Sequence, residues 1–483
     1  MDRSRAYAGG WHSRVIRVFR VGEVASAFLL CISAVSSLAA EAKSPLTGEE
    51  LGAAYQAQWN RQLNAEIDAR IEKFRKGDAV AKGFAPGSTV RIRQVESAFL
   101  FGANLFNFDQ FPDHEKNLKY QQGFRNLFNA ATIGFYWKNF EPLRGQNRFL
   151  PGPHDAESFW ATCPNPTAQN EWRRPAPEPL LRYCEGNGIS VHGHVMIYPP
   201  FHPAWLAQLH GAELEAAYAQ RIRDLAAFYK GRIPQWDIVN ESVNRSCTPD
   251  APNDDICWGR KQLEVPKDYT FVCFKEAEKM LPPEVKLVIN DSWRPIYPPF
   301  IRSLLKRGAK IDVVGIQMHI FTKQAAAQIA RGEKVTPNNT SWNPADQIQM
   351  LKQLDTLGRP IHLSEITIPA PEENARGEDI QARLLRDNYR LWFSWPTINR
   401  ITYWNVVDHV GMEILPSGFF ARDMRPKAVA WALDRLVNHE WRTNMTSPAD
   451  ADGTVRFRGF KGKYLLTGTG TDGKPLDLAI TVE

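Results

Sequence analysis

The feature that most constrains the fold is a series of eight short apolar, β-like segments, each followed by a segment with helical spacing of its apolar residues. Eight such units in a row are typical of a closed barrel rather than an open doubly wound sheet. We therefore predict an α/β fold, a (β/α)8 TIM barrel over residues 97–438. The expected strands are 98–105, 131–136, 190–198, 233–241, 286–291, 312–319, 360–367 and 400–408. The expected helices are 117–129, 176–187, 212–230, 268–281, 297–308, 344–357, 378–394 and 427–438.

Segments with other patterns flank the barrel. Apolar residues at helical spacing predict one long helix over 46–76, and alternation over 89–95 predicts an exposed strand. After Glu440 the chain alternates again over 454–460, 463–467 and 476–482, which predicts a small C-terminal β appendage packed on the barrel or joined to the strand near residue 90. The expected division is a signal peptide (1–42), an N-terminal helix and strand extension (43–96), the barrel (97–438) and the appendage (439–483).

The first 42 residues have the layout of a secretory signal. Arginines precede an apolar run over 24–38, which ends in the small-residue stretch 38–42. The run is short for a membrane span, so we expect no stable membrane insertion after cleavage, and a secreted or periplasmic protein. A buried N-terminal helix is the alternative. Cys247 and Cys257 lie in one loop-like stretch and are candidates for a disulfide in an oxidising compartment.

Composition excludes several classes of protein. Of 483 residues, 43% are hydrophobic and 23% charged, as in soluble globular proteins. The net charge of +6 is too small to indicate nucleic acid as a partner. No Cys-x-x-Cys pair supports a zinc ribbon. The 15 Trp residues suit either packing or stacking on sugar rings.

Catalytic groups of such a barrel lie at the carboxyl ends of its strands. Two glutamates, Glu241 and Glu365, end the fourth and seventh predicted strands, which face each other across the ring. Paired carboxylates across one pocket are what glycoside hydrolysis requires, because one protonates the leaving oxygen while the other attacks or activates water. Further polar and aromatic residues at strand ends are candidates for binding a polysaccharide substrate: Asn104, His194, Tyr198, Asn240, Gln317, His319 and Trp404.

A metal site is the competing interpretation of one of these motifs. His192 and His194 form a His-x-His pair on one strand, so that both side chains face the same side, which also suits a metal. No obvious further ligand set accompanies them. We therefore expect neither a metal nor another cofactor.

Six segments in order resemble glycoside hydrolase family 10, the endo-β-1,4-xylanases. The resemblance covers roughly residues 97–438. It rests on His192-Gly193-His194 with Pro203-Ala204-Trp205-Leu206, Trp236-Asp237-Ile238-Val239-Asn240-Glu241, Leu287-Val288-Ile289-Asn290-Asp291, Val314-Gly315-Ile316-Gln317-Met318-His319, His362-Leu363-Ser364-Glu365-Ile366-Thr367 and Ile401-Thr402-Tyr403-Trp404.

The resemblance implies a role for each of five residues. Glu241 would be the acid/base and Glu365 the nucleophile of a retaining mechanism. Asn240 would hold the 2-hydroxyl of the sugar at the cleavage point. His319 would hydrogen-bond Glu365 and keep it ionised, with Gln317 beside it.

The chain departs from the family pattern where the family grips the sugar beyond the cleavage point. The family's Glu-Asn and Lys at the end of strand 2 are replaced by a stretch containing Tyr136 and Lys138. Tyr198 and its neighbours stand where the family has Trp-His after strand 3. Thr367 replaces the Asp usually found two residues after the nucleophile, and the Trp expected after Asp408 is missing.

Taken together, these features predict a retaining glycoside hydrolase that cleaves β-1,4-xylosidic bonds in xylan or a related plant polysaccharide. One alternative keeps the mechanism but changes the substrate to another β-glycan. The other alternative is a noncatalytic glycan-binding barrel, which would not need both carboxylates.

Overall fold

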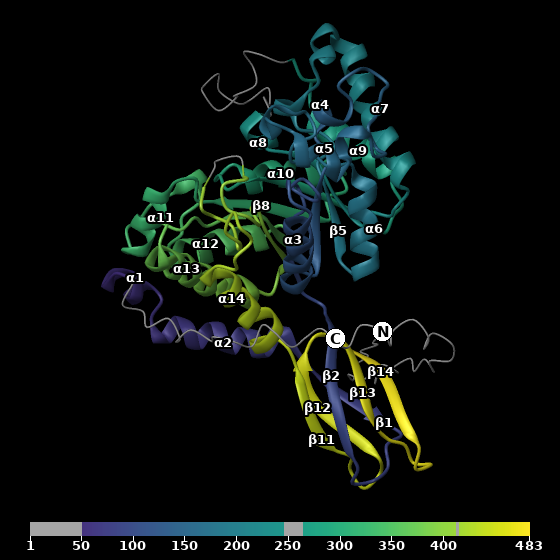
Figure 1. The fold of residues 1–483 in the computed structure, drawn as a ribbon, viewed down its shortest axis with the longest axis vertical. Coiled ribbons are helices and arrows are strands. Elements are labelled where there is room, and N and C mark those ends of the chain that lie inside the picture. The colour runs from purple at the N-terminus through teal and green to yellow at the C-terminus, as the bar shows by residue number, and fades with distance from the viewer. Residues whose placement is uncertain (1–50, 246–263, 412–414) are drawn as a thin grey trace, which may run out of the picture. The chain divides into compact units, whose positions relative to one another are not determined.

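The structure, a computed structural model, describes residues 51–245, 264–411 and 415–483 (Figure 1). The predicted signal peptide over 1–42 and the Cys247–Cys257 pair lie outside the described residues. The chain divides into two compact units. Of the described residues, the larger unit contains 51–75 and those within 99–441, and the smaller unit contains 76–98 and 442–483.

The larger unit is built on a closed barrel of eight parallel strands, as the alternating pattern predicted. Each strand pairs with the next along the chain, and the last pairs with the first. Their short apolar sequences suit strands buried on both faces. The strands are β3 (Leu100–Asn104), β4 (Ala130–Gly134), β5 (Ser190–His194), β6 (Gln235–Asn240), β7 (Lys286–Ser292), β8 (Val313–His319), β9 (Ile361–Thr367) and β10 (Ile398–Tyr403).

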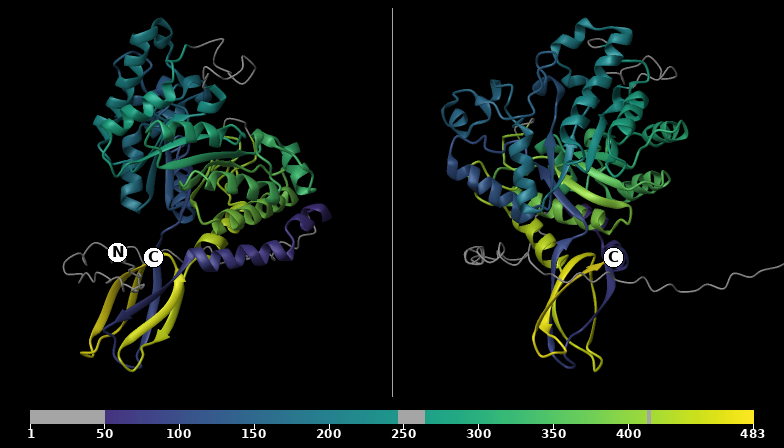
Figure 2. Two further views of the ribbon diagram at one scale, coloured as in Figure 1. Left: turned by 180° about the vertical axis from the view of Figure 1, so that it is seen from behind. Right: turned by 90° about the vertical axis from the view of Figure 1, so that its right-hand side faces the viewer.

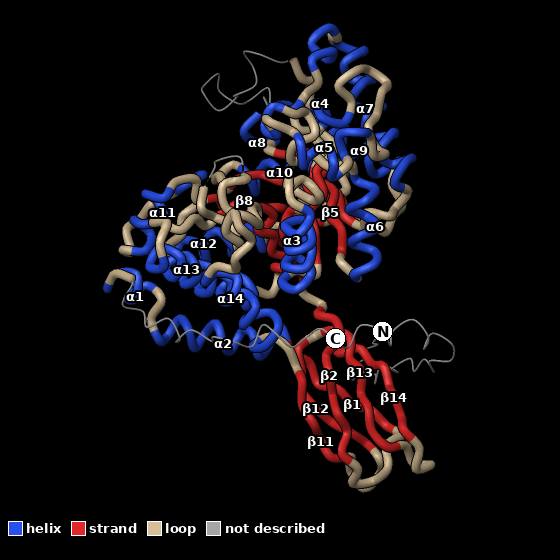
Figure 3. Tube along the Cα trace, in the orientation of Figure 1, coloured by secondary structure: helices blue, strands red, loops and turns tan. Residues whose placement is uncertain are grey.

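Helices surround this barrel (Figure 3). Each of the eight predicted helical segments contains a helix, whereas α4, α5, α8 and α11 were not predicted. The helices that follow the first barrel strand are α3 (His114–Leu127), α4 (Trp137–Phe140), α5 (Glu157–Thr162), α6 (Pro177–Asn187), α7 (Gly211–Tyr229), α8 (Ser242–Arg245), α9 (Tyr269–Met280), α10 (Tyr297–Lys306), α11 (Lys323–Ala330), α12 (Pro344–Asp355), α13 (Ala375–Ser394) and α14 (Ala428–Asp434). In the part of the chain that the structure describes, no helix is long and apolar enough to cross a bilayer.

The prediction of one helix over 46–76 is wrong. Two helices, α1 (Ala53–Gln58) and α2 (Arg61–Arg75), are separated at Trp59 and Asn60. The Asn60 side-chain oxygen accepts a hydrogen bond from the backbone N–H of Leu63 at 2.9 Å, as the cap of a new helix does. Helical spacing of apolar residues continues across the break, so the spacing alone did not indicate it.

The smaller unit consists of antiparallel strands from both ends of the chain (Figure 2). In one sheet β1 (Lys76–Lys82) pairs with β12 (Thr454–Phe460). In the other, the order is β11 (Asn444–Pro448), β2 (Thr89–Ser97), β13 (Gly462–Thr469) and β14 (Pro475–Val482). The strand near residue 90 is therefore joined to the C-terminal strands, and residues 76–98 belong to this unit rather than with the helix before them.

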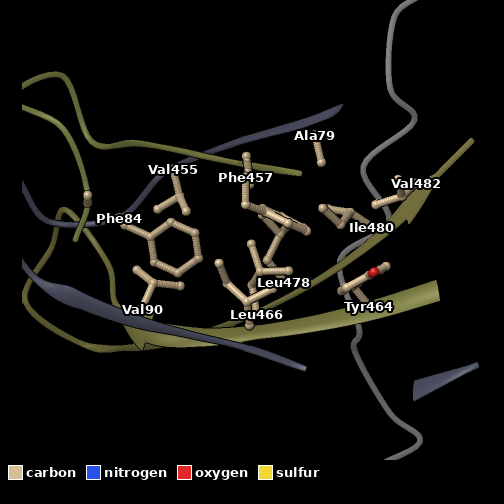
Figure 4. Close-up of a cluster of buried hydrophobic side chains, with 13 residues drawn as sticks. Ala79, Phe84, Val90, Val455, Phe457, Tyr464, Leu466, Leu478, Ile480 and Val482 are labelled. Atoms are coloured by element: carbon tan, nitrogen blue, oxygen red, sulfur yellow. The ribbon is translucent and has the colours of Figure 1, made fainter. Parts of the chain in front are cut away.

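Alternation along these strands produces the core of the smaller unit. In β2 the even-numbered side chains from Val90 to Gln94 are buried and their neighbours are exposed or half-buried. Both sheets contribute to one apolar cluster, in which Phe457 of β12 lies among side chains of β13 and β14 such as Leu466 and Ile480 (Figure 4).

A close approach inside the barrel requires glycine at position 193. Gly193 of β5 pairs with Trp236 of β6, and a Cβ atom at Gly193 would lie 2.3 Å from the indole ring. The indole cannot move aside easily, because it is buried and contacts the rings of Phe135 and Tyr229. The glycine thus allows the two strands that carry His194 and Glu241 to lie side by side.

We expect Gly193→Ala to lower the free energy of unfolding by about 1–3 kcal/mol, the usual effect of overpacking a core. The matched control is Gly186→Ala near the end of α6, where a Cβ atom meets nothing within 4 Å. That change should leave stability equal or slightly higher, since alanine favours a helix. Thermal unfolding of the three proteins measures both effects, and an unchanged melting temperature for Gly193→Ala would contradict this packing.

Candidate active site

The two glutamates predicted to be catalytic lie at the carboxyl ends of β6 and β9. Glu365 lies within β9 and only 5% of its surface is exposed. Glu241 directly follows β6, is half-buried, and has a φ of 54°. Its backbone N–H donates to the carbonyl oxygen of Asn290 at 2.7 Å. This bond ties the turn that carries Glu241 to the neighbouring strand β7.

Three side chains donate hydrogen bonds to the Glu365 carboxylate. Asn290 Nδ2 and Gln317 Nε2 reach Oε1 at 2.7 and 3.1 Å, and His319 Nε2 reaches Oε2 at 3.2 Å. A carboxylate accepts all three bonds, whereas a carboxylic acid would have to donate at one oxygen. These donors come from the neighbouring strands β7 and β8, so the barrel itself positions them.

His319 reaches Glu365 in an orientation that Thr367 determines. Its Nδ1 lies 2.8 Å from the Thr367 hydroxyl oxygen. A neutral imidazole satisfies both contacts when Thr367 donates to Nδ1 and the ring proton stays on Nε2, facing Glu365. Thr367 is therefore a neutral partner of His319.

Gln317 connects the two glutamates. Its Nε2 lies 3.1 Å from Glu365 Oε1 and 3.5 Å from Glu241 Oε1. Those two oxygens are therefore no farther apart than the sum of these distances. The same nitrogen lies 3.2 Å from Asn240 Oδ1, which brings the residue before Glu241 into the network.

Asn290 is a site residue that the sequence analysis did not include among its candidates. Its Nδ2 bonds both Glu365 and, at 2.8 Å, Asn240 Oδ1, and it is fully buried. Gly315 on β8 makes room for it, since a Cβ atom there would lie 2.5 Å from Asn290 Oδ1. The sequence offered a signal for it, because Asn290 directly follows the apolar strand residues Leu287-Val288-Ile289.

His192 and His194 share a carboxylate. Their ring nitrogens lie 2.8 and 2.7 Å from Oδ2 of Asp237, and all three side chains are buried. Burial alone would raise the pKa of Asp237, but the charges and hydrogen bonds of the two histidines outweigh it and hold the pKa below its usual range. Among the residues described, no three His, Cys, Asp or Glu side chains are grouped to hold a metal ion.

An aromatic cluster lies beside this network. It contains Phe106, Tyr136 and Trp404, with Tyr198 and Phe201 packed against them. Trp404 meets the rings of His194 and His319 edge-on, at centroid distances of 5.2 and 6.2 Å. The cluster is thus in contact with the residues that support Glu365.

Two further predicted binding residues, Asn104 and Tyr198, differ in their surroundings. The Asn104 amide donates to the backbone oxygen of Trp404, so this side chain joins the ends of β3 and β10. Tyr198 is half-buried and stacks on Phe201 at 5.3 Å. The Asn104 amide therefore stabilises the barrel by a hydrogen bond to the backbone, whereas the Tyr198 ring is partly exposed to solvent.

Asp291 is a buried acid behind Glu241. Its two oxygens accept the backbone N–H groups of Val243 and Ser292 at 2.7 and 2.8 Å. Burial and the charge of Glu241 raise the pKa of Asp291 to about 8, although these two hydrogen bonds act in the opposite direction. Burial beside Glu241 thus favours the protonated form of Asp291 more than exposure to water would.

Comparisons with known proteins identify the family of the chain. The profile of Glycosyl hydrolase family 10 matches residues 114–415. The chain is 24% identical over 400 residues to Endo-1,4-beta-xylanase 2 of Arabidopsis thaliana, covering 79% of this chain and 30% of that protein. It is 24% identical over 297 residues to Anti-sigma-I factor RsgI6 of Acetivibrio thermocellus, and this match covers 60% of this chain and 34% of that protein. The chain thus spans about a third of the length of these relatives.

Solved structures share the fold. The crystal structure of xylanase 10B from Thermotoga petrophila RKU-1 in complex with xylobiose has a TM-score of 0.54 and 20% identity. The match covers 71% of this chain and 95% of that one. The native xylanase 10B from Thermotoga maritima gives the same score and identity. At this identity the likeness concerns the barrel fold.

The raised pKa of Asp291 predicts a pH dependence of stability. The folded chain holds a proton on Asp291 that the unfolded chain releases near pH 4, so this residue lowers stability increasingly as pH rises from about 4 to 8. We therefore expect the melting temperature of the wild type to fall more steeply between pH 5 and pH 9 than that of Asp291→Asn. Parallel curves for the two proteins would contradict the assignment.

Proposed function

Because the chain belongs to glycosyl hydrolase family 10, we propose that it is a retaining glycoside hydrolase that cleaves β-1,4-xylosidic bonds in xylan or a related plant polysaccharide. The observation that carries the proposal is the network around Gln317, which brings two glutamates from opposite sides of a barrel to one amide nitrogen. The name of the Arabidopsis relative, an endo-1,4-beta-xylanase, supports the choice of substrate.

In the proposed first step, Glu365 is the nucleophile and Glu241 the acid. A Glu365 carboxylate oxygen forms a bond to the anomeric carbon while the bond from that carbon to the glycosidic oxygen breaks. Glu241 gives its proton to the departing oxygen, which leaves as a free hydroxyl group. The three donors to Glu365 hold it as a carboxylate in the orientation for attack. The product is a glycosyl ester of Glu365.

In the second step, Glu241 acts as the base. It takes a proton from a water molecule, whose oxygen bonds to the anomeric carbon as the ester bond to Glu365 breaks. Two displacements at one carbon retain its configuration. Retaining enzymes have carboxyl groups about 5–5.5 Å apart, against about 6.5–9.5 Å for inverting ones. The Nε2 atom of Gln317 lies within hydrogen-bond reach of both carboxylates, which places Glu241 and Glu365 at one site, as both steps require.

Asn240 is proposed to bind the sugar at the cleavage point. Its Oδ1 accepts from both Asn290 and Gln317, which leaves its amide group to face away from these donors. That group is then oriented to donate to a sugar hydroxyl. Trp404 and Tyr198 are proposed to contact the sugar ring, and Gln317 and His319 to support Glu365.

From the order of basic, apolar and small residues over 1–42, we propose that this segment is a signal peptide and that the protein acts in a secreted or periplasmic location. The remaining chain is proposed to function as an extension, a catalytic barrel and a small β appendage. We propose that catalysis needs no metal or cofactor, since the two carboxylates suffice for both steps.

A noncatalytic glycan-binding barrel is the second candidate. Two observations favour keeping it: the relative named anti-sigma-I factor RsgI6, and the altered residues at the ends of the second and third barrel strands. Hydrolysis of another β-glycan by the same chemistry remains the closest alternative. A panel of β-glycans, with both binding and product release measured, separates these three possibilities.

We expect Glu365→Gln to lower kcat on xylan at least about 10³-fold, because no covalent intermediate can form. Glu241→Gln should lower it about 10²–10⁴-fold, with a smaller loss on substrates whose leaving group needs no proton. The matched control is Glu213→Gln on the surface of α7, which should retain full activity. Two glutamine variants with wild-type activity on every cleaved glycan would contradict the mechanism.

Azide distinguishes the two roles. Azide added to Glu241→Ala should restore turnover by attacking the glycosyl ester and give a β-glycosyl azide, since the configuration is retained. Azide added to Glu365→Ala should displace an activated leaving group directly and give the α-azide. Product stereochemistry, read by NMR, checks both expectations. The opposite pairing of products would exchange the two assigned roles.

A further inference from the structure

A buried arginine covers the aromatic cluster on the β4 side of the two glutamates. Arg174 is 6% exposed, and its guanidinium carbon lies 3.6 Å from the ring centre of Tyr136 and 5.0 Å from that of Phe106. Its Nη1 donates to the backbone oxygen of Arg173 at 2.6 Å. Its Nε is buried and has no acceptor among the described residues. The ring faces it covers are therefore not open for stacking on a sugar.

Arg174 lies among positive charges. Arg173 is equally buried and lies 5.5 Å from the ring centre of Phe106, and Lys138 Nζ lies 4.5 Å from that of Phe201. In the described ranges, no carboxylate forms an ion pair with Arg174 or Lys138. Arg148 differs from them, because its Nη1 forms an ion pair with Oδ1 of Asp155 at 2.7 Å.

A buried guanidinium without a carboxylate partner is costly. Taking the charge out of water is repaid only when an anion and its hydrogen bonds replace the water. Burial is the main influence on the pKa of Arg174 and lowers it to about 10. The guanidinium group therefore stays charged at neutral pH. Contact with the Tyr136 ring recovers part of the cost. An anion from outside the chain would recover the rest.

The cationic group lies close to the reacting carboxylates. Burial raises the pKa of Tyr136, and the charges that also act on its hydroxyl include those of Arg174 and Glu365, with smaller effects of Arg173 and Glu241. Ring contacts also connect Tyr136 with the residues around Glu365. The rings of Tyr136 and Trp404 both contact the ring of Phe106, and Trp404 contacts His319. Tyr136 therefore connects the guanidinium group of Arg174 with the surroundings of Glu365.

We infer that Arg174, with Arg173 and Lys138, forms a subsite for the carboxylate of a uronic acid residue carried by the substrate next to the cleavage point. The inference rests on the proposed function and specifies its substrate: an acidic rather than a neutral β-glycan. The planar fork of a guanidinium matches a carboxylate with two parallel hydrogen bonds. The ring of Tyr136 fixes the plane of that fork. A neutral sugar would leave the buried charge uncompensated.

The test uses two substrates that differ only in charge. One is a xylo-oligosaccharide substituted with glucuronic acid, and the other is the same compound with its carboxyl group reduced to an alcohol. We expect kcat/KM of the wild type to favour the acidic substrate by about 10–100-fold, as for hydrogen bonds to charged groups. Arg174→Gln should abolish that preference, with the loss confined to the acidic substrate. Lys138→Gln, at an exposed position, should reduce it partly.

Two controls separate charge recognition from structural damage. Arg182→Gln, at an exposed position on α6, should keep the preference, and Arg174→Lys should keep part of it. Equal kcat/KM of the wild type on both substrates would overturn the subsite and leave the proposed hydrolysis intact. An equal loss on both substrates in Arg174→Gln would also overturn it, because Arg174 would then act only in packing.

Binding tests the subsite even without turnover. Calorimetry with Glu365→Gln compares the two oligosaccharides directly, and we expect the acidic one to bind at least about 10-fold more tightly. Equal affinity would overturn the subsite. Absence of cleavage by the wild type with tighter binding of the acidic compound would overturn the proposed hydrolysis but support the carboxylate site.

Discussion

A buried carboxylate and the donors that face it organise the centre of this molecule. Glu365 lies inside a barrel strand, where an unpaired charge would be costly, and Asn290, Gln317 and His319 compensate for that burial. These donors project from β7 and β8, the strands that precede β9 in the barrel. Backbone geometry serves the same purpose, because Gly315 has no side chain where Asn290 must pass. The barrel therefore supplies a buried carboxyl group with three hydrogen-bond donors at the carboxyl ends of its strands.

Beneath this network the barrel interior continues to be polar. Asp237 accepts from two histidines, and Trp404 links one of them by ring contacts to His319. Asp291 holds the backbone after Glu241 by accepting the N–H group of Val243, and it also accepts the N–H group of its neighbour Ser292. The difference between the two buried acids has a physical cause: Asp237 has imidazole partners that favour its charged form, whereas Asp291 has only backbone donors and lies beside another carboxylate.

The regular alternation of strand-like and helical segments predicted the barrel, because a buried parallel strand and the amphipathic helix after it each have a clear pattern of apolar residues. Patterns failed where a single side chain decides the local structure, as when Asn60 ends one helix and begins another. Both glutamates could be located because strand ends are where such barrels carry their chemistry. Asn290 was not identified as a site residue, and the use of Asn104 within the fold was not foreseen, because each depends on which neighbour the amide faces.

The chain belongs to glycosyl hydrolase family 10 and differs from the family pattern at the ends of the second and third barrel strands, where Arg174 covers the ring of Tyr136. In the proposed mechanism a covalent bond forms between Glu365 and the substrate. Incubation with a 2-deoxy-2-fluoro-β-xylobioside bearing a good leaving group tests it directly, because the fluorine slows breakdown of the intermediate. Mass spectrometry of the digested protein should find one fluoroxylobiosyl group, on the peptide that contains Glu365. An unlabelled protein that still hydrolyses xylan, or a label on another residue, would contradict the account.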